Sequence, residues 1–291
     1  MHRQGPQACQ IRTPARTTRA LKTTTPDLLV VGTSIDPHID RVLELLPDSV
    51  DVVRLDVDQY PKASTISIDQ AGYQTRVSVN SRTILDGEAT VPVVWFRRLG
   101  APGLGEAVEE RYRRFAVAEA NHVLESALSL VRPRHWVNEY WSTRRAALKP
   151  HQSRAAARAG LSTPDTAITN DPTMAQSWLV RQPYAVSKTL SSPVVFDDDD
   201  ERGFSFTHVL DERDRAELLA VRVTPTQFQT LIEPAFELRV TSIGPKHFAV
   251  RIDADVVASQ GVRDWRSERL ATSYSWFDLP PDLEARLTEF L

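Results

Sequence analysis

The chain has 291 residues, of which 41% are hydrophobic and 25% are charged, and its net charge is −3. This balance is typical of an ordinary globular protein and argues against general nucleic-acid binding, which usually requires a clearly basic domain. No apolar run approaches the roughly 20 residues needed to span a bilayer. The only cysteine, Cys9, allows neither a disulfide framework nor a thiolate metal site, so we expect a cytoplasmic protein.

Residues 1–26 differ in composition from the rest of the chain. They contain basic residues, many Thr and Pro, and no acidic residue. They lack the continuous apolar segment of a secretory signal. We predict a disordered basic tail. The alternative is a basic arm that touches an acidic partner.

A first domain is expected over residues 27–131, and it opens with a βαβ pattern. An apolar run from Asp27 is followed by a helix and by a second strand near residues 50–61. Short alternating strands lead to a strand at 92–98, and a long helix is predicted over 105–131. The first helix has an apolar face of Ile39, Val42, Leu43 and Leu46. The long helix has an apolar stripe of Val108, Tyr112, Phe115, Val123, Ala127 and Leu130.

Two arginines, Arg97 and Arg98, end the strand at 92–98. Ligands of open α/β sheets gather at the carboxyl ends of the strands, so both side chains are candidates to bind a peptide carboxylate or a phosphate. The alternative is a pair of surface salt bridges to Glu106 or Glu109.

The remaining residues, 132–291, contain a helix that Pro150 begins and Gly160 ends. A small α/β lobe follows, and the final third is mainly antiparallel. Four cationic side chains stand where plain packing would not place them: Lys149, Lys188, Arg239 and Arg266. Each alone is typical of a solvated surface. Together they would suit the phosphates of a nucleotide.

Six motifs occur in a particular order: "WFRR", "NEYWSTRRAALKPHQSRAAARAGLSTPDTAITND", "AVSK", "TQFQ", "FELRVTSIG" and "DWR". In this order the chain resembles, from about residue 27 to 291, the ATP-grasp ligases called graspetide or microviridin-type synthetases. The resemblance implies an α/β plus α+β chain. Its parts would be a pre-ATP-grasp α/β domain with a linking helix at 27–131 and an ATP-grasp domain at 132–291.

The resemblance also implies roles for individual residues. Lys149 and Lys188 would contact the ATP phosphates. The main chain of Gln229, Thr230, Leu231 and Ile232 would be the hinge that pairs with adenine. Arg239 and Arg266 would be catalytic and hold the γ-phosphate and the acyl phosphate formed from it. Arg suits that role because it keeps its charge and offers a planar fork of donors.

The implied activity is an ATP-dependent ligation with Mg²⁺ as a further cofactor. A side-chain carboxylate of a ribosomal precursor peptide would be activated as an acyl phosphate and then attacked by a hydroxyl or amine, giving an ω-ester or ω-amide crosslink. The implied partner is a precursor peptide with a leader and an acidic or hydroxyl-bearing core, with neither nucleic acid nor membrane involved. A homodimer is compatible with this reading.

One departure from the family concerns the metal. After "DWR" the family has a magnesium-binding Asp and a Glu-x-Asn motif, and neither is found at a matching position. Asp253, Asp255 and Asp264 are nearby acids, and Asp264 is better explained as a partner for an arginine. We therefore expect an ATP-grasp fold that is incomplete at its C-terminal end, with weak ATP binding and little turnover by this chain alone.

Two rival functions remain open at this point. One is a catalytically impaired nucleotide- or peptide-binding homologue, and the other is a carboxylate–amine ligase for small molecules. The acidic run at 197–200 is typical of a solvated loop rather than of a cation site. The basic segment at 144–160 has a small alanine face, which does not favour nucleic-acid binding.

Overall fold

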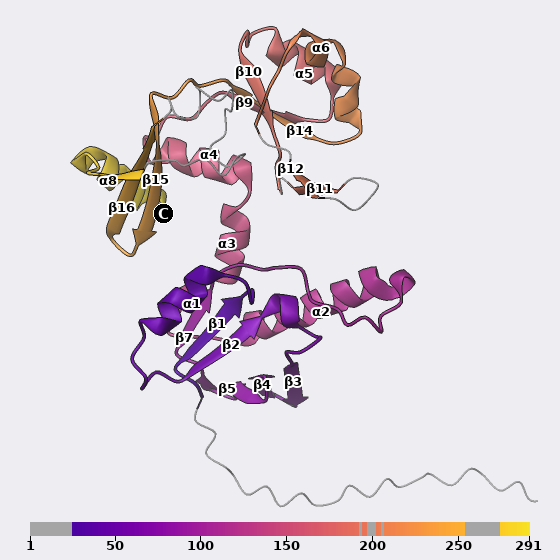
Figure 1. Ribbon diagram of the computed structural model, residues 1–291, viewed down its shortest axis with the longest axis vertical. Coiled ribbons are helices and arrows are strands. Elements are labelled where there is room, and N and C mark those ends of the chain that lie inside the picture. The colour runs from indigo at the N-terminus through magenta and orange to yellow at the C-terminus, as the bar shows by residue number, and fades with distance from the viewer. Residues whose placement is uncertain (1–24, 192–193, 197–201, 205–206, 254–273) are drawn as a thin grey trace, which may run out of the picture. The chain divides into compact units, whose positions relative to one another are not determined.

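A computed structural model describes residues 25–191, 194–196, 202–204, 207–253 and 274–291. The chain divides between Thr143 and Arg144 into two compact units, each described by itself below (Figure 1). The predicted tail at 1–26 lies almost entirely outside the described residues. None of the described helices is both long and apolar enough to cross a membrane.

The first unit is built on a four-stranded parallel sheet. Its strands, in spatial order, are β2 (Val52–Asp56), β1 (Leu28–Gly32), β7 (Val93–Phe96) and β8 (His135–Val137). The helices of this unit are α1 (Pro37–Glu44), the 3₁₀ turn η1 (Val57–Gln59) and α2 (Glu110–Leu130). A separate antiparallel meander contains β3 (Ile66–Ala71), β4 (Gln74–Val79), β5 (Arg82–Asp86) and β6 (Ala89–Thr90). The predicted βαβ unit is confirmed by the parallel pairing of β1 with β2.

The core of the first unit corrects the two predicted helix faces. In α2 the buried residues are Ala120, Leu124, Ala127 and Leu128, whereas Tyr112 and Phe115 are 50% and 66% exposed. Only the second half of α2 packs on the core, so the predicted stripe is wrong over the first half. In α1 only Ile39 is buried, and the helix ends at Glu44, because Pro47 disfavours a helical Leu46.

The second unit has two parts. One is a lobe of helices around a four-stranded sheet, called the mixed lobe below, and the other contains a separate three-stranded antiparallel sheet. The four-stranded sheet has the order β13 (His208–Val209), β10 (Ala185–Lys188), β14 (Thr226–Thr230) and β9 (Thr166–Thr169). A hairpin pairs β11 (Val194–Phe196) with β12 (Arg202–Phe204), and a three-stranded sheet contains β15 (Phe236–Ile243), β16 (Lys246–Asp253) and β17 (Tyr274–Phe277). The helices are α3 (Tyr140–Ala146, at the boundary of the units), α4 (Lys149–Arg158), α5 (Pro172–Leu179), α6 (Glu212–Ala216), the 3₁₀ turn η2 (Leu218–Arg222) and α8 (Pro281–Phe290).

The boundary between the units lies after the expected one at residue 131. The reason is the short strand β8, which pairs in parallel with β7 and thereby extends the first sheet. The sequence pattern did not single out this strand, nor β17, which pairs with β16. Both are short strands, and neither shows a clear alternation of apolar and polar residues.

The sheet of the mixed lobe has two different faces. One face packs on α5 and η2 through a small apolar cluster that contains Ala167, Trp178, Leu179, Ala185, Val221 and Phe228. The rings of Trp178 and Phe228 lie 6.4 Å apart, centroid to centroid. Because successive residues of a strand point to opposite faces, the neighbours of Phe228 in β14 point away from this cluster.

Candidate active site

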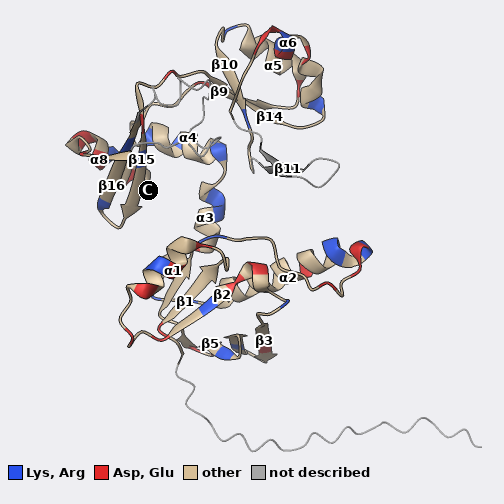
Figure 2. Ribbon diagram, viewed as in Figure 1, with Lys and Arg blue, Asp and Glu red and all other residues tan. Residues whose placement is uncertain are grey.

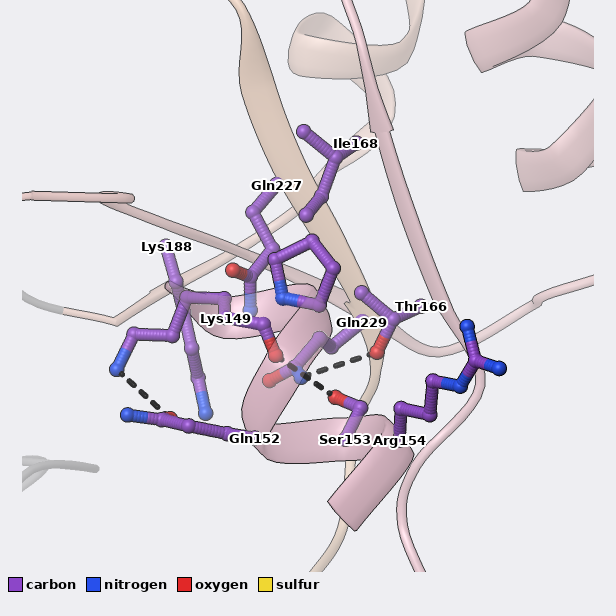
Figure 3. Close-up of a pocket in the computed structure, with 10 residues that line it drawn as sticks. Lys149, Gln152, Ser153, Arg154, Thr166, Ile168, Lys188, Gln227 and Gln229 are labelled. Atoms are coloured by element: carbon purple, nitrogen blue, oxygen red, sulfur yellow. Dashed lines mark hydrogen bonds between the residues drawn. The ribbon is translucent and has the colours of Figure 1, made fainter. Parts of the chain in front are cut away.

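A cleft of about 650 Å³ lies in the second unit between the first turns of α4 and the polar face of the mixed-lobe sheet (Figure 3). Its walls come from α4 and from strands β9, β10 and β14. The residues that line it are Lys149, Pro150, Gln152, Ser153, Arg154, Thr166, Ile168, Lys188, Gln227 and Gln229.

The sheet wall of the cleft is set by strand register. Gln227 of β14 lies opposite Lys188 of β10 on one side and opposite Ile168 of β9 on the other. Two residues further along β14, Gln229 lies opposite Thr166, and its Nε2 donates a hydrogen bond to Thr166 Oγ1 at 3.1 Å. The wall therefore presents a row of Ile168, Gln227 and Lys188 beside a row that contains Thr166 and Gln229.

The helix wall of the cleft is cationic. Helix α4 carries basic residues and no acidic one, as Figure 2 shows. Lys149 is half-buried at its start, and its Nζ donates to Gln152 Oε1 at 3.3 Å. Leu148, the residue before the helix, makes no side-chain cap. In the first turn Pro150 has no N–H, and the N–H of His151 donates to Leu148 O at 3.0 Å. The N-terminal end of a helix carries partial positive charge, which adds to that of Lys149.

Three of the six predicted cofactor-binding residues line this cleft: Lys149, Lys188 and Gln229. The other three, Thr230, Leu231 and Ile232, do not line it. The N–H of Thr230 donates to Asp165 O and that of Leu231 to Tyr184 O, each at 3.0 Å. These two donors hold the end of the sheet, and the pairing of the main chain from Gln229 to Ile232 with adenine stays a prediction.

Of the two predicted catalytic arginines, the structure describes only Arg239. Arg239 is exposed on β15, opposite Val250 of β16, and does not line the cleft. Arg266 lies outside the described residues.

Arg97 and Arg98 form ion pairs with a carboxylate of the first unit, that of Asp36. Their Nε atoms lie 3.4 Å and 2.9 Å from Oδ2 of Asp36, whose side chain is fully buried. The expected alternative, ion pairs to Glu106 or Glu109, is wrong, because the ion pairs of both arginines are to Asp36. Glu109 pairs with Arg111. Asp36 Oδ2 lies at ion-pair distance from Arg98 but accepts no hydrogen bond of good geometry, so the contact is one between opposite charges.

Asp36 is also the N-cap of α1. Its Oδ1 accepts a hydrogen bond from the N–H of His38 at 3.0 Å. Burial opposes ionisation of Asp36, but the His38 amide and the charges of Arg97 and Arg98 outweigh it, so the pKa of Asp36 is lowered from its ordinary 3.8. Asp36 therefore orders the two arginines at the carboxyl end of β7.

The residues expected near a metal give no site in the described part of the chain. There, no group of three or more His, Cys, Asp and Glu is arranged to hold a metal ion. Asp253 ends β16, and Asp255 and Asp264 lie outside the described residues.

Several cleft residues were missed by sequence reasoning, including Gln152, Arg154, Thr166, Ile168 and Gln227. A signal for Gln227 exists in "TQFQT", where two glutamines alternate with one aromatic residue. Once Phe228 is assigned to the core, the period of two places both glutamines on the opposite face. The sequence of helix α4 gives no such signal. None of its residues is buried, so no core residue marks the face that lies opposite the cleft.

Comparison with known proteins agrees with this architecture. Residues 28–144 match the family model of the MvdD pre-ATP-grasp domain. A RiPP-associated ATP-grasp ligase from Chryseobacterium gregarium, solved with ADP and a leader and core peptide, is similar with a TM-score of 0.78 and 26% identity. The match covers 90% of this chain and 80% of that chain.

The resemblance to the graspetide-type ATP-grasp ligases is confirmed. The macrocyclase MdnC of Microcystis aeruginosa MRC, bound with its precursor peptide MdnA, shares the fold at 21% identity, with a TM-score of 0.74 over 90% of this chain and 81% of that chain. The ATP-grasp ligase PsnB, solved with a phosphomimetic variant of a minimal precursor, Mg and ADP, shares it at 20% identity, with a TM-score of 0.69 over 92% of this chain and 82% of that chain. No curated protein has a matching sequence.

The fold-class prediction is also confirmed: a pre-ATP-grasp α/β domain precedes an ATP-grasp fold. The cleft between α4 and the sheet lies in the ATP-grasp part of the chain.

Proposed function

We propose that this graspetide-type chain is an ATP-dependent ligase that crosslinks a ribosomal precursor peptide through its side chains. The γ-phosphoryl group of ATP passes to a side-chain carboxylate of the peptide, giving an acyl phosphate and ADP. A Ser or Thr hydroxyl, or a Lys amine, of the same peptide then attacks the acyl carbon and expels phosphate. An ω-ester or ω-amide bond results, and the peptide loses one water for each crosslink.

The observation that carries the proposal is the convergence of Lys149 and Lys188 on one cleft from two separate elements. Lys149 comes from the start of α4 and Lys188 from the end of β10. Two fixed cations and a helix N-terminus give a triphosphate the charge complement that it needs, since catalysis of phosphoryl transfer depends on positioning and charge stabilisation. The similar ligase from Chryseobacterium gregarium, solved with ADP and a leader and core peptide, supports an ATP-dependent peptide ligase in general.

The proposed division of labour follows from the position of each cation. Lys149 and Lys188 hold the nucleotide in the cleft. Arg239, together with Arg266, is proposed to act on the γ-phosphate and on the acyl phosphate. Arg97 and Arg98 are proposed to bind a peptide carboxylate, because Asp36 engages the Nε side of each guanidinium and both side chains remain partly exposed.

Mg²⁺ is proposed as a further cofactor, and the roles above are assigned to side chains only. Mg²⁺, when bound to a triphosphate, neutralises charge on the β- and γ-phosphates. Among the described residues, no group of three or more His, Cys, Asp and Glu is arranged to hold it. The roles above therefore rest on cationic side chains alone.

The test is mass spectrometry of a precursor peptide incubated with the purified full chain, ATP and Mg²⁺. A suitable peptide comes from a neighbouring reading frame rich in Thr, Ser, Asp and Glu. Loss of one or more waters that requires ATP, and that the Lys188→Met protein no longer catalyses, supports the proposal. ATP binding without any dehydration of the peptide would instead indicate a nucleotide-binding homologue without turnover. Ligation of small carboxylates and amines only would indicate a small-molecule ligase.

A further inference from the structure

One polar side chain in the cleft has an unmet hydrogen-bonding need. Gln227 is only 3% exposed, yet it lines the cleft, and its buried Oε1 atom accepts no hydrogen bond from the described residues. Buried acceptors in folded proteins are nearly always paired, because an unpaired one loses its bonds to water without replacement. The side chain is therefore suited to a donor that arrives with a ligand.

The position of Gln227 limits what that donor can be. Gln227 lies between apolar Ile168 and cationic Lys188 in one cross-strand row, and Figure 3 shows the same order on the sheet wall. An adenine nucleotide has the same two ends, a flat apolar base and a charged triphosphate. If the phosphates bind at Lys188, the same row would place the base toward Ile168 and its edge at Gln227.

The donor then follows from the chemistry of the base. Adenine linked to ribose carries nitrogen-bound hydrogens only on its 6-amino group. We propose that Oε1 of Gln227 accepts a hydrogen bond from this amino group and thereby selects adenine nucleotides. This inference rests on the proposed function, and it assigns to that site a residue that fixes nucleotide specificity.

The same contact would act against other purines. Hypoxanthine and guanine carry an oxygen acceptor where adenine carries the amino group. With the Gln227 amide held in the orientation described, its Oε1 would face that oxygen and neither acceptor would be satisfied, which is the situation in which polar sites discriminate most strongly. A ribose hydroxyl is the other donor of the nucleotide, and it is distinguished by experiment.

Calorimetry with four nucleotides tests the inference on the full chain. The ligands are ATP, purine riboside triphosphate (which lacks the 6-amino group), inosine triphosphate and 2′-deoxy-ATP. The wild-type protein should bind ATP about tenfold or more tightly than purine riboside triphosphate, and inosine triphosphate more weakly still. Affinity for 2′-deoxy-ATP should stay close to that for ATP.

The informative variant is Gln227→Met, which keeps the length of the side chain and removes the acceptor. It should bind ATP and purine riboside triphosphate within about twofold of each other, with the loss falling on ATP. Gln176→Leu, at an exposed glutamine of α5 outside the cleft, should behave as wild type. Without nucleotide, the melting temperature of Gln227→Met should not fall, because the variant removes an unpaired buried acceptor.

Three results would overturn the inference. They are a wild-type protein indifferent to the 6-amino group, a Gln227→Met protein that keeps the preference, and a preference that follows the 2′-hydroxyl instead. A Gln227→Met protein that dehydrates the precursor peptide but keeps its preference removes the specificity role and leaves the proposed function intact. A wild-type chain that binds no nucleotide removes both.

Discussion

Lys149 and Lys188 line the cleft from two different elements. Their contribution to phosphate binding can be separated from the contribution of the adenine base by comparing ATP with adenosine. If Lys149 and Lys188 bind phosphates, replacing both with Met should weaken ATP binding and leave adenosine binding nearly unchanged. Each lost charge-assisted contact should cost roughly 1.5–3 kcal/mol of binding free energy. Calorimetry with both ligands measures the difference. Arg158→Met, in the last turn of the same helix and outside the cleft, is the matched control, and equal effects on ATP and adenosine would remove the lysines from this role.

Arg239 is proposed to act on the acyl phosphate and not on nucleotide affinity. It lies on β15 and does not line the cleft. Arg239→Lys should therefore keep ATP binding within about threefold and lose most crosslink formation, because Lys keeps the charge but not the planar fork of donors. Calorimetry and peptide mass spectrometry on the same preparation check both halves. An Arg239→Lys protein with poor ATP affinity would contradict the assignment.

Asp36 serves both the cap of α1 and the two arginines, and two substitutions separate these tasks. Asp36→Asn keeps an acceptor for the cap and removes the charge, and it should lower the free energy of unfolding by roughly 1 kcal/mol because both arginines are partly exposed. Asp36→Ala should cost about 1 kcal/mol more, since it also removes the cap. Denaturant unfolding measures both, and equal stability of the two variants would show that the cap contributes nothing.

At the scale of the element, helix α4 is followed by a left-handed position that favours glycine. Gly160 has φ +71°, and its carbonyl accepts a hydrogen bond from Arg286 Nη1 of α8 at 2.9 Å. A Cβ there would meet only Arg286 at 3.9 Å, so the strain of Gly160→Ala comes from the backbone and not from crowding. We expect a loss of about 1 kcal/mol in unfolding free energy, and a smaller loss for Gly160→Asn. Thermal unfolding of both variants checks the order.

The elements also show what periodicity can and cannot predict. The end of α4 was predictable, because Pro at the start and Gly past the end have local steric causes. The buried half of α2 was not, since an apolar stripe shows which face can be buried but not how far along the helix a neighbour extends. Leu124 and Phe115 are both apolar in that sequence, and only Leu124 meets the core.

For the site, Lys149, Lys188 and Gln229 were predicted from the order of short motifs. Two other features could not be predicted from the sequence. The pairing of Arg97 and Arg98 with Asp36 joins residues far apart in the chain, and no local pattern reports it. The engagement of the Leu231 N–H by Tyr184 O is likewise tertiary. Charge and strand periodicity indicate which residues are candidates for a site. The partners of those residues depend on which segments the fold brings together.

At the scale of the whole molecule, acid should destabilise both units. Burial opposes ionisation of Asp36 and Asp58, but hydrogen bonds from His38 and Ser34 outweigh it, and the amide of Asp211 stabilises ionised Asp214. The pKa of all three carboxyls is lowered from 3.8.

The unfolded chain therefore binds more protons than the folded one in this range. The stabilisation is complete above pH values near 3.8 and is lost as pH falls through the lower pKa values of the folded state. Calorimetric melting temperatures from pH 6 to pH 2 should decline most steeply below pH values near 4. The double variant Asp36→Asn, Asp58→Asn should show a flatter decline, and an unchanged slope would contradict these assignments.

Strand β14 couples the apolar cluster to the cleft in a way that matters for engineering. Its residues alternate between the two, with Gln227 and Gln229 at the cleft and Phe228 on Trp178. Inserting or deleting one residue would exchange these roles, placing a ring in the cleft and amides in the cluster. A library meant to change nucleotide preference should therefore randomise positions 227 and 229 together, hold Phe228 fixed, and keep the length of the strand constant.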